Sequence, residues 1–334
     1  MKIHVTTGAT GPGAWTHQRD KLWELFSQSR VKAHEWVGTP QEADVIFLCN
    51  VMQPGKSDIS DHPVLRAYRE KTFVLSEQWQ PPFNAAGIYA NAPRKLGWRQ
   101  RFRTGSYALH HQDFKNKLVD AFEPSQMLPP EKRDLLASFL GRDCHPVRAK
   151  IFAAGTTRPD ILIEDTSWFD AFSHGQDRKA DAQARYFDIC LRSRYLLCPR
   201  GAGPNSIRLF EALKMGIAPV IIADDFILPS GVDWPSFAIF IKERDAADWI
   251  RIVAQHENEF LERGKNAREA HLRFFAPDVY FNYLVENALS IKAARVLPER
   301  VFAAVDRLME RVGRLDQKVR RRLKLRRPAQ PAQA

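Results

Sequence analysis

Short apolar runs alternate with segments of helical periodicity along the first third of the chain. Three runs are short and rich in β-branched residues, namely Ile3–Thr7, Val45–Cys49 and Thr72–Ser76, a pattern that predicts buried strands. Between the first two, apolar residues recur at helical spacing around Leu22 and Leu25. This alternation predicts a parallel α/β sheet, in which ligands bind at the carboxyl ends of the strands.

The same alternation restarts after a proline-rich stretch at Pro124–Pro130. Strands are predicted at Leu135–Leu140, Ile161–Ile163, Tyr195–Cys198, Pro219–Ala223 and Phe237–Ile241, and helices at 182–193, 206–215 and 246–264. A chain of 334 residues exceeds the size at which one core keeps growing, so two domains are expected. We place the first domain at residues 1–125 and the second at 126–292.

A third segment, residues 293–327, has the pattern of an amphipathic, basic helix, and a polar tail at 328–334 is expected to be disordered. Its apolar residues alternate spacings of four and three, as in a coiled-coil seam. They are Val301, Val305, Leu308, Val312, Leu315 and Val319. Because the seam covers fewer than three heptads, it predicts packing either on the chain's own body or on a second copy through residues 297–322.

The net charge of +11 is concentrated near the C-terminus. Residues 298–334 contain eleven Lys and Arg against four acidic residues, which leaves only +4 for the rest of the chain. We therefore expect no nucleic-acid partner for the body. The cluster 318–327 either contacts anionic lipid headgroups, at about 1 kcal/mol per charge near the surface, or is a solvated tail.

The amino-acid composition favours a soluble protein. Apolar residues make up 44% and charged residues 27% of the chain, and we find neither a run of about 18 apolar residues nor the pattern of a signal peptide. The expected location is cytoplasmic, or peripheral at the inner face of a membrane. The cysteines Cys49, Cys144, Cys190 and Cys198 form no C-x-x-C pair, so we expect reduced thiols.

Residues 186–241 carry the pattern with the most chemistry. A strand is followed by a turn that contains Gly201 and Gly203, where backbone N–H groups can face a ligand. Asn205 or Ser206 can then cap the helix that follows. The N-terminus of that helix is a ready anion site, suited to a diphosphate.

Arg208 and Glu211 lie three residues apart on the first turn of the same helix, so their side chains share one face. An arginine there can bind phosphate with its planar fork, and a carboxylate can accept the hydroxyls of a ribose. From this geometry, the segment is either a nucleotide-diphosphate site or a capped surface helix with an Arg–Glu ion pair.

The order of residues here resembles the signature of the exostosin family of glycosyltransferases. The similarity runs from Tyr186 to Phe237 through C-P-R-G, S-x-R-x-x-E-A-L, G-x-x-P-V-I-I-x-D-D, L-P and D-W-x-x-F, and the upstream S-F-L-G-R-D-C-H-P-V-R at 138–148 is similar too. The resemblance implies a GT-B fold, in which two Rossmann-like domains face a cleft with the donor nucleotide in the second and the acceptor in the first. It also implies inverting transfer without a bound metal or other cofactor.

The resemblance further implies how the donor is held. Arg200 and Arg208 would neutralise the diphosphate, Ser206 and the backbone of Gly201–Gly203 would bind its oxygens, and Glu211 would hold the ribose. These groups would also stabilise the charge that develops as the nucleotide leaves.

An inverting displacement needs a general base, which should come from the first domain. Glu77 is the first candidate, because it follows the predicted strand Thr72–Ser76 at the ligand-binding end of the sheet. His17 and Asp20, close to the loop after the first strand, are the alternatives.

Three other charged residues leave two interpretations each. Arg148 is either a further cation of the donor cleft or a solvated helix residue. Asp224 and Asp225 follow a predicted buried strand and precede an L-P turn, which favours turn acids over metal ligands.

These patterns predict a glycosyltransferase that moves a sugar from a nucleotide-diphosphate donor, most simply a UDP-sugar, to a glycan or lipid-linked glycan acceptor. One alternative is a fucosyltransferase-like enzyme that uses a GDP-sugar. A second is a non-catalytic adaptor on a transferase fold, which would bind nucleic acid or membrane through its basic tail.

Overall fold

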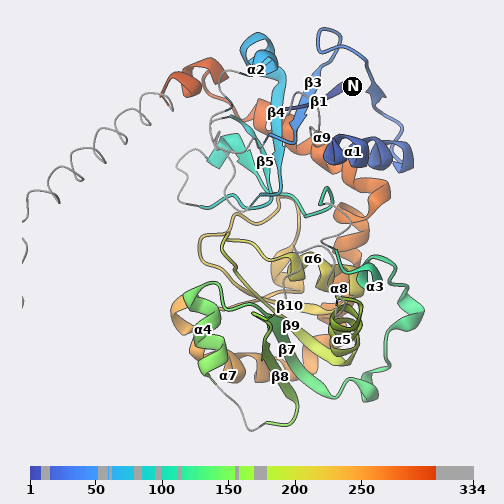
Figure 1. The fold of residues 1–334 in the computed structure, drawn as a ribbon, viewed down its shortest axis with the longest axis vertical. Coiled ribbons are helices and arrows are strands. Elements are labelled where there is room, and N and C mark those ends of the chain that lie inside the picture. The colour runs from blue at the N-terminus through green and yellow to red at the C-terminus, as the bar shows by residue number, and fades with distance from the viewer. Residues whose placement is uncertain are drawn as a thin grey trace, which may run out of the picture.

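The computed structural model describes residues 1–8, 16–51, 59, 62–78, 85–94, 99–110, 115–154, 158–168 and 179–305. Two parallel sheets lie one above the other, each with helices packed against it (Figure 1). This is the two-domain α/β architecture of GT-B type that the sequence predicts.

The first sheet contains the N-terminal strands. Its order is β2 (Glu35–Trp36), β1 (Lys2–Thr7), β3 (Val45–Cys49), β4 (Thr72–Ser76), β5 (Gly87–Tyr89) and β6 (Phe102–Arg103), with every pairing parallel. The predicted bounds of β3 and β4 are confirmed, and β1 begins one residue earlier than predicted. All residues of β3 and β4 are buried, as expected for the middle of a parallel sheet covered on both faces.

Helices from both ends of the chain cover the first sheet. Helix α1 (His17–Gln28) buries Leu22 and Leu25, as predicted, and α2 (Pro63–Tyr68) precedes β4. Helix α9 (Pro277–Ala293) packs along α1, and its Phe281 ring meets Phe26 at 5.2 Å between centroids. The predicted second domain included residues 277–292, yet this helix packs on the first sheet. Its apolar pattern predicts burial but not which sheet it buries against.

The second sheet has the order β11 (Ile239–Phe240), β10 (Ala218–Ile222), β9 (Ser193–Pro199), β7 (Leu135–Gly141) and β8 (Ile161–Asp165), again all parallel. Its helices are α4 (Pro146–Ala153), α5 (Lys179–Arg192), α6 (Ile207–Met215), α7 (Trp249–Ala254) and α8 (Phe260–Ala270). The short helix α3 (Lys117–Asp120) lies in the connection between the two sheets.

The helix predicted at 246–264 is interrupted. A 3₁₀ segment at Glu243–Asp248 leads into α7, and a second one at Glu257–Glu259 separates α7 from α8. The break coincides with a tertiary hydrogen bond, in which the hydroxyl of Tyr195 donates to the His256 carbonyl at 2.6 Å. That carbonyl also accepts the Glu259 N–H at 2.9 Å, an i→i+3 bond of the 3₁₀ segment in place of the i→i+4 bond of an α-helix.

The predicted helix at 293–327 does not begin at 293. Residues 294–298 leave the helical conformation, and helix resumes at 299–305, immediately after Pro298, which disfavours a continuous helix. The buried side of this turn is formed by Glu299, Phe302 and Ala303, whereas Val301 of the predicted seam is 39% exposed. Val305 of the seam is partly buried. The seam from Leu308 onward and the basic cluster 318–327 lie outside the described residues.

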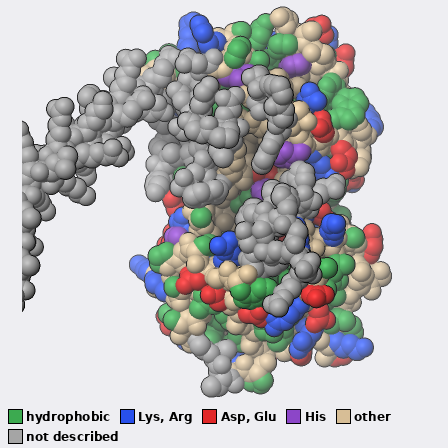
Figure 2. All heavy atoms as spheres, viewed as in Figure 1, with side chains coloured by type: hydrophobic (Ala, Val, Ile, Leu, Met, Phe, Trp, Pro, Cys, Tyr) green, Lys and Arg blue, Asp and Glu red, His purple; other side chains and the backbone are tan. Residues whose placement is uncertain are grey.

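The four cysteines are free, and Cys49, Cys190 and Cys198 are buried as expected, while Cys144 is exposed. Burial raises the pKa of the Cys49 thiol to about 12, so it stays protonated and inert. None of the described helices combines the length and apolar character that crossing a membrane requires. On the face seen in Figure 2, acidic and basic side chains are interspersed.

Candidate active site

The junction of β9 and α6 forms the centre of the predicted site. The strand ends at Pro199, and the Arg200 N–H donates to the Ile222 carbonyl at 3.1 Å, which ties the following turn to β10. Ser206 occupies the N-cap position of α6, but its side chain makes no capping hydrogen bond. Gly216 ends the helix with a φ of 68°, the left-handed conformation that glycine adopts without strain.

Glu211 and Arg208 are held by aromatic side chains. The Glu211 carboxylate accepts a hydrogen bond of 2.6 Å from the Tyr186 hydroxyl. The Arg208 guanidinium lies over the Phe139 ring at 5.1 Å and near the Tyr186 ring at 6.0 Å. The surface-helix alternative required an Arg208–Glu211 ion pair, and within the described part of the chain Glu211 bonds to Tyr186 instead. Burial raises the pKa of Glu211 above its usual value.

Both side chains line a cavity of about 160 Å³, which we call the Arg208 cavity. Its walls come from the carboxyl ends of β7 and β8, from α5 and α6, and from Asn116. They are Asn116, Leu140, Glu164, Thr166, Trp168, Ala182, Gln183, Arg185, Tyr186, Ile207, Arg208 and Glu211. This is the edge of a parallel sheet where ligands bind.

Three polar atoms of the predicted phosphate-binding residues are buried without a hydrogen-bond partner among the described residues. They are the Ser206 Oγ, the Arg208 Nε and the Arg200 Nε. A buried polar atom without a partner is costly, and such an atom at a cavity points to a ligand that supplies the missing partner. Of the three residues, Arg208 lines the Arg208 cavity.

The Arg200 side chain contacts a carboxylate of the second domain. Its guanidinium lies 3.5 Å from the Glu243 carboxylate, whose oxygen also accepts the Asp224 N–H at 3.0 Å. The Asp224 carboxylate in turn accepts the Glu243 N–H at 3.3 Å. Asp224 therefore acts as a turn acid, the interpretation the sequence favours. Glu243 carried no sequence signal, because it lies 43 residues from Arg200 and meets it only in the fold.

Arg148 is neither solvated nor open to a donor. Its side chain is buried and donates to the carbonyls of Arg200 at 2.9 Å, Arg142 at 3.0 Å and Pro199 at 3.4 Å. Burial, and then the nearby Arg208 charge, lower the pKa of Arg148 to about 10. Arg148 therefore stabilises the backbone at Pro199 and Arg200 through these hydrogen bonds. The alternative of a solvated helix residue is wrong.

Gly201, Gly203 and Asn205 contact protein atoms rather than the Arg208 cavity. A Cβ on Gly203 would lie 2.3 Å from the Asn91 Oδ1, and one on Gly201 would lie 3.2 Å from the Arg148 guanidinium. The Asn205 amide donates to the Ala90 carbonyl at 2.7 Å. Gly203 and Asn205 therefore join the second domain to the first, which corrects the donor-site prediction for the Asn205 side chain, while ligand binding by the Gly201–Gly203 backbone stays a prediction.

The base candidate Glu77 has both oxygens engaged. One accepts the Leu109 N–H at 2.6 Å, and the other lies 3.1 Å from the His110 Nδ1. The Tyr107 ring contacts His110 at 5.7 Å and Phe210 of α6 at 6.1 Å, which places the Glu77–His110 pair close to the second domain. Sequence reasoning missed His110, because nothing local links it to a carboxylate 33 residues earlier.

The other base candidates have local contacts. The His17 Nδ1 lies 3.4 Å from the Asn50 amide nitrogen. The side chain of Asp20 is 61% exposed and accepts a hydrogen bond of 3.0 Å from Thr16. Tyr107 connects the surroundings of Glu77 to α6, whereas the contacts of His17 and Asp20 include Asn50 and Thr16.

Solved glycosyltransferase structures align with most of the chain at low similarity. The Anabaena Alr3699/HepE structure in complex with UDP and glucose aligns with a TM-score of 0.40 and 10% identity, covering 86% of this chain and 99% of that one. MurG of Acinetobacter baumannii aligns with a TM-score of 0.38 and 11% identity, covering 85% of this chain and 99% of that one.

Sequence comparison finds relatives of the middle of the chain. Residues 94–256 match the Exostosin GT47 domain. A probable beta-1,4-xylosyltransferase IRX10 of Arabidopsis thaliana is 35% identical over 89 residues, and a probable glucuronosyltransferase 47 A of Physcomitrium patens is 37% identical over 91 residues. Each match covers 26% of this chain, and 22% and 20% of the respective relatives, so it spans about a fifth of their length. This stretch of the chain, residues 94–256, is therefore similar to the Exostosin GT47 domain.

Proposed function

We propose that this protein is an inverting glycosyltransferase that transfers a sugar from a nucleotide-diphosphate donor, a UDP-sugar, to a glycan or lipid-linked glycan acceptor. The observation that carries the proposal is the Arg208 cavity, where an arginine and a partly buried glutamate lie at the end of a parallel sheet and the Arg208 Nε is buried without a hydrogen-bond partner among the described residues. The names of the relatives, a xylosyltransferase and a glucuronosyltransferase, support group transfer between sugars.

The donor-binding roles follow from the contacts. Arg208 keeps its plane fixed by stacking on Phe139, so its fork is preorganised for a phosphate oxygen pair. The unpartnered Ser206 hydroxyl donates to the same diphosphate, and Arg200 shifts from its 3.5 Å contact with Glu243 toward it. Glu211, oriented by Tyr186, accepts the ribose hydroxyls.

The reaction needs charge stabilisation on one side and a base on the other. The acceptor oxygen attacks the anomeric carbon while the bond from that carbon to the diphosphate breaks, and the nucleotide diphosphate leaves with the electron pair. Arg200 and Arg208 offset its negative charge, without a metal. The acceptor proton passes to the Glu77–His110 pair, with Glu77 orienting the imidazole.

We further propose a cytoplasmic location with peripheral attachment to an anionic membrane surface through 318–327, and a homodimer through 297–322. The support is the charge pattern of the sequence and the exposure of Val301, the first residue of the seam.

The test is a thermal-shift panel of UDP, GDP, CDP and ADP in EDTA, on the wild type, Arg208→Ala and Glu211→Ala. Arg251→Ala, on the exposed side of α7, is the matched control. A ligand at 100 times its Kd adds about 2.7 kcal/mol to the stability of the folded state. We expect UDP to stabilise the wild type and the control, but neither site variant.

The other outcomes separate the alternatives. Stabilisation by GDP alone would point to the fucosyltransferase-like enzyme. Stabilisation that requires manganese in place of EDTA would contradict the metal-independent mechanism. No response to any nucleotide by a folded wild type would overturn the donor site and favour the non-catalytic adaptor.

A further inference from the structure

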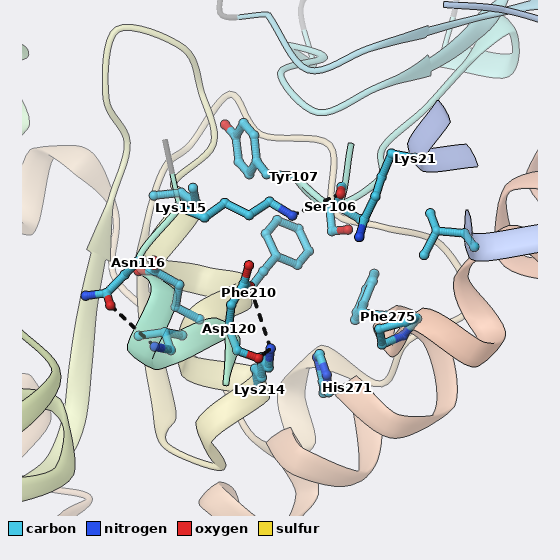
Figure 3. A pocket seen from close by; sticks show the side chains of 16 residues that line it. Lys21, Ser106, Tyr107, Lys115, Asn116, Asp120, Phe210, Lys214, His271 and Phe275 are labelled. Carbon is cyan, nitrogen blue, oxygen red and sulfur yellow. Dashed lines mark hydrogen bonds and ion pairs between the residues drawn. The ribbon is translucent and has the colours of Figure 1, made fainter. Parts of the chain in front are cut away.

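A second and larger cavity, of about 240 Å³, lies between the two domains (Figure 3). Helix α1, the segments 106–108 and 115–120, α6, and the turn before α9 form its wall. We call it the lysine cavity, because three lysines from three different segments line it, namely Lys21, Lys115 and Lys214.

The three ammonium groups face a shared space. Figure 3 shows Lys21 and Lys115 extending toward each other past Ser106, with Lys214 on the opposite wall. The Lys21 Nζ lies 2.8 Å from the Glu24 carboxylate, and the Lys115 Nζ donates to the Ala108 carbonyl at 3.0 Å. Each ammonium has three donors, and a single contact of this kind uses one.

Lys214 shows that positive charge is crowded here. Its Nζ lies 3.6 Å from the Asp120 carboxylate, yet burial lowers its pKa, and the nearby Lys115 charge contributes in the same direction. A bound anion would relieve that repulsion and favour the charged form of the lysine.

His271 gives an independent sign of a missing ligand. Its side chain is only 7% exposed and lines the lysine cavity, and its Nδ1 has no hydrogen-bond partner among the described residues. It begins a π-helical turn at His271–Phe275, a distortion that is frequent at functional sites. Burial, together with Arg268 and Lys214, lowers the pKa of His271 to about 3, so the ring is neutral at physiological pH.

The remaining wall is largely apolar and aromatic. Phe210 and Phe275 contact each other with ring centroids 5.2 Å apart, and Tyr107 packs against Phe210. An apolar, aromatic wall beside a few convergent polar groups is typical of a small-molecule site. The C–H face of a sugar ring can pack against such a wall, and its hydroxyls can form hydrogen bonds with the His271 imidazole.

The lysine cavity also adjoins the Arg208 cavity. Asn116, Ile207 and Glu211 line both, so ligands in the two cavities would be separated by little more than these side chains. An acceptor must lie next to the donor sugar for in-line attack.

We propose that the lysine cavity is the acceptor site, and that it takes a sugar unit bearing one anionic group, a carboxylate or a phosphate, held by Lys21, Lys115 and Lys214. This inference rests on the proposed glycosyltransferase function. It goes beyond that function by naming the chemistry of the acceptor.

The experiment is saturation-transfer NMR on the full chain with glucuronate, glucose 6-phosphate and glucose. We expect at least one acidic sugar to bind about tenfold more tightly than glucose, because a hydrogen bond to a charged group is worth about 1.5 kcal/mol or more. Lys21→Met and Lys115→Met should each lose most of that advantage, and Lys115→Arg should retain it. Lys265→Met, whose side chain is 75% exposed on α8, is the control and should bind as the wild type does.

The two acidic probes distinguish the source of the charge: glucuronate alone indicates a carboxylate, and glucose 6-phosphate alone a phosphate. Equal binding of glucose and both acidic sugars, or acidic-sugar binding that both lysine variants retain, would overturn the proposal. If UDP stabilises the protein while no acidic sugar binds, only this inference fails. If an acidic sugar binds through the lysines but no nucleotide binds, the anion site stands and the transferase function fails.

Discussion

Residues 201–205 and residues 206–211 belong to one continuous motif, yet they have different surroundings. In the first part, Gly203 approaches Asn91 closely and Asn205 donates to the Ala90 carbonyl, so both contact the first domain. In the second part, Ser206 and Arg208 keep buried polar atoms without partners beside a cavity.

The difference teaches that one motif combines two physical tasks. The glycine turn brings the domains into contact, because a residue without Cβ allows the Asn91 side chain to approach its backbone. The first turn of α6 then presents charge to a ligand. Substitutions in the first part should therefore act on stability, and those in the second part on nucleotide binding and catalysis.

The largest effect expected is on catalysis. Arg208→Ala should lower kcat/KM by about 10²–10³, the range for removing a group that stabilises transition-state charge, which corresponds to about 2.7–4 kcal/mol. The free energy of unfolding should change less than the activation free energy, because the Nε has no protein partner among the described residues to lose and the loss is that of the ring contacts with Phe139 and Tyr186. Initial rates with a radiolabelled donor, alongside melting curves, measure both. A large loss of stability with unchanged kcat/KM would contradict the division of the motif.

The second effect is on stability. Gly203→Val should destabilise the fold by about 1–3 kcal/mol, the range for overpacking, because its Cβ would lie 2.3 Å from the Asn91 Oδ1. Urea unfolding measures the change, and the control Asn91→Gly should recover part of it when combined with Gly203→Val. If the loss of unfolding free energy in the double variant equals the sum of the losses in the two single variants, Gly203→Val does not clash with Asn91.

A smaller effect is expected where an aromatic side chain supports the site. Tyr186→Phe removes the 2.6 Å hydrogen bond to Glu211 and should weaken UDP binding by about 1 kcal/mol, since Glu211 loses its orientation. Isothermal titration calorimetry measures the change. The control is Tyr195→Phe, whose hydroxyl bonds to the distant His256 carbonyl and should leave UDP affinity unchanged. Equal weakening in both variants would show a general packing effect.

The sequence predicted most of the strands because their signal is local. The apolar, β-branched run Val45–Cys49 is itself the strand, and Arg208 and Glu211 share a helix face by spacing alone. The Arg208–Glu211 part of the candidate site was therefore predictable before any tertiary contact was known.

What could not be predicted depends on contacts between distant segments. His110 meets Glu77, Glu243 meets Arg200, and α9 returns to the first sheet, and each pairing is fixed by packing rather than by spacing. Asparagine is a residue type that often caps helices, but the Asn205 amide donates a hydrogen bond to the Ala90 carbonyl of the first domain. No local sequence pattern predicts that contact. The lysine cavity is a further case, because its three lysines come from three different segments.

The smallest effect concerns the charge of Glu211. Because burial raises its pKa, the folded state holds the proton more tightly than the unfolded chain does. The resulting stability is present below the ordinary glutamate pKa of about 4.5 and is lost as the pH rises through the raised value. The free energy of unfolding of Glu211→Gln, measured with urea, should therefore rise relative to that of the wild type between pH 4.5 and 7. At the acidic end the two free energies should differ little. Glu262→Gln on the exposed side of α8 should show no such trend. A pH-independent difference for Glu211→Gln would mean that the carboxylate is solvated, and the two parts of the motif would then differ less than their contacts indicate.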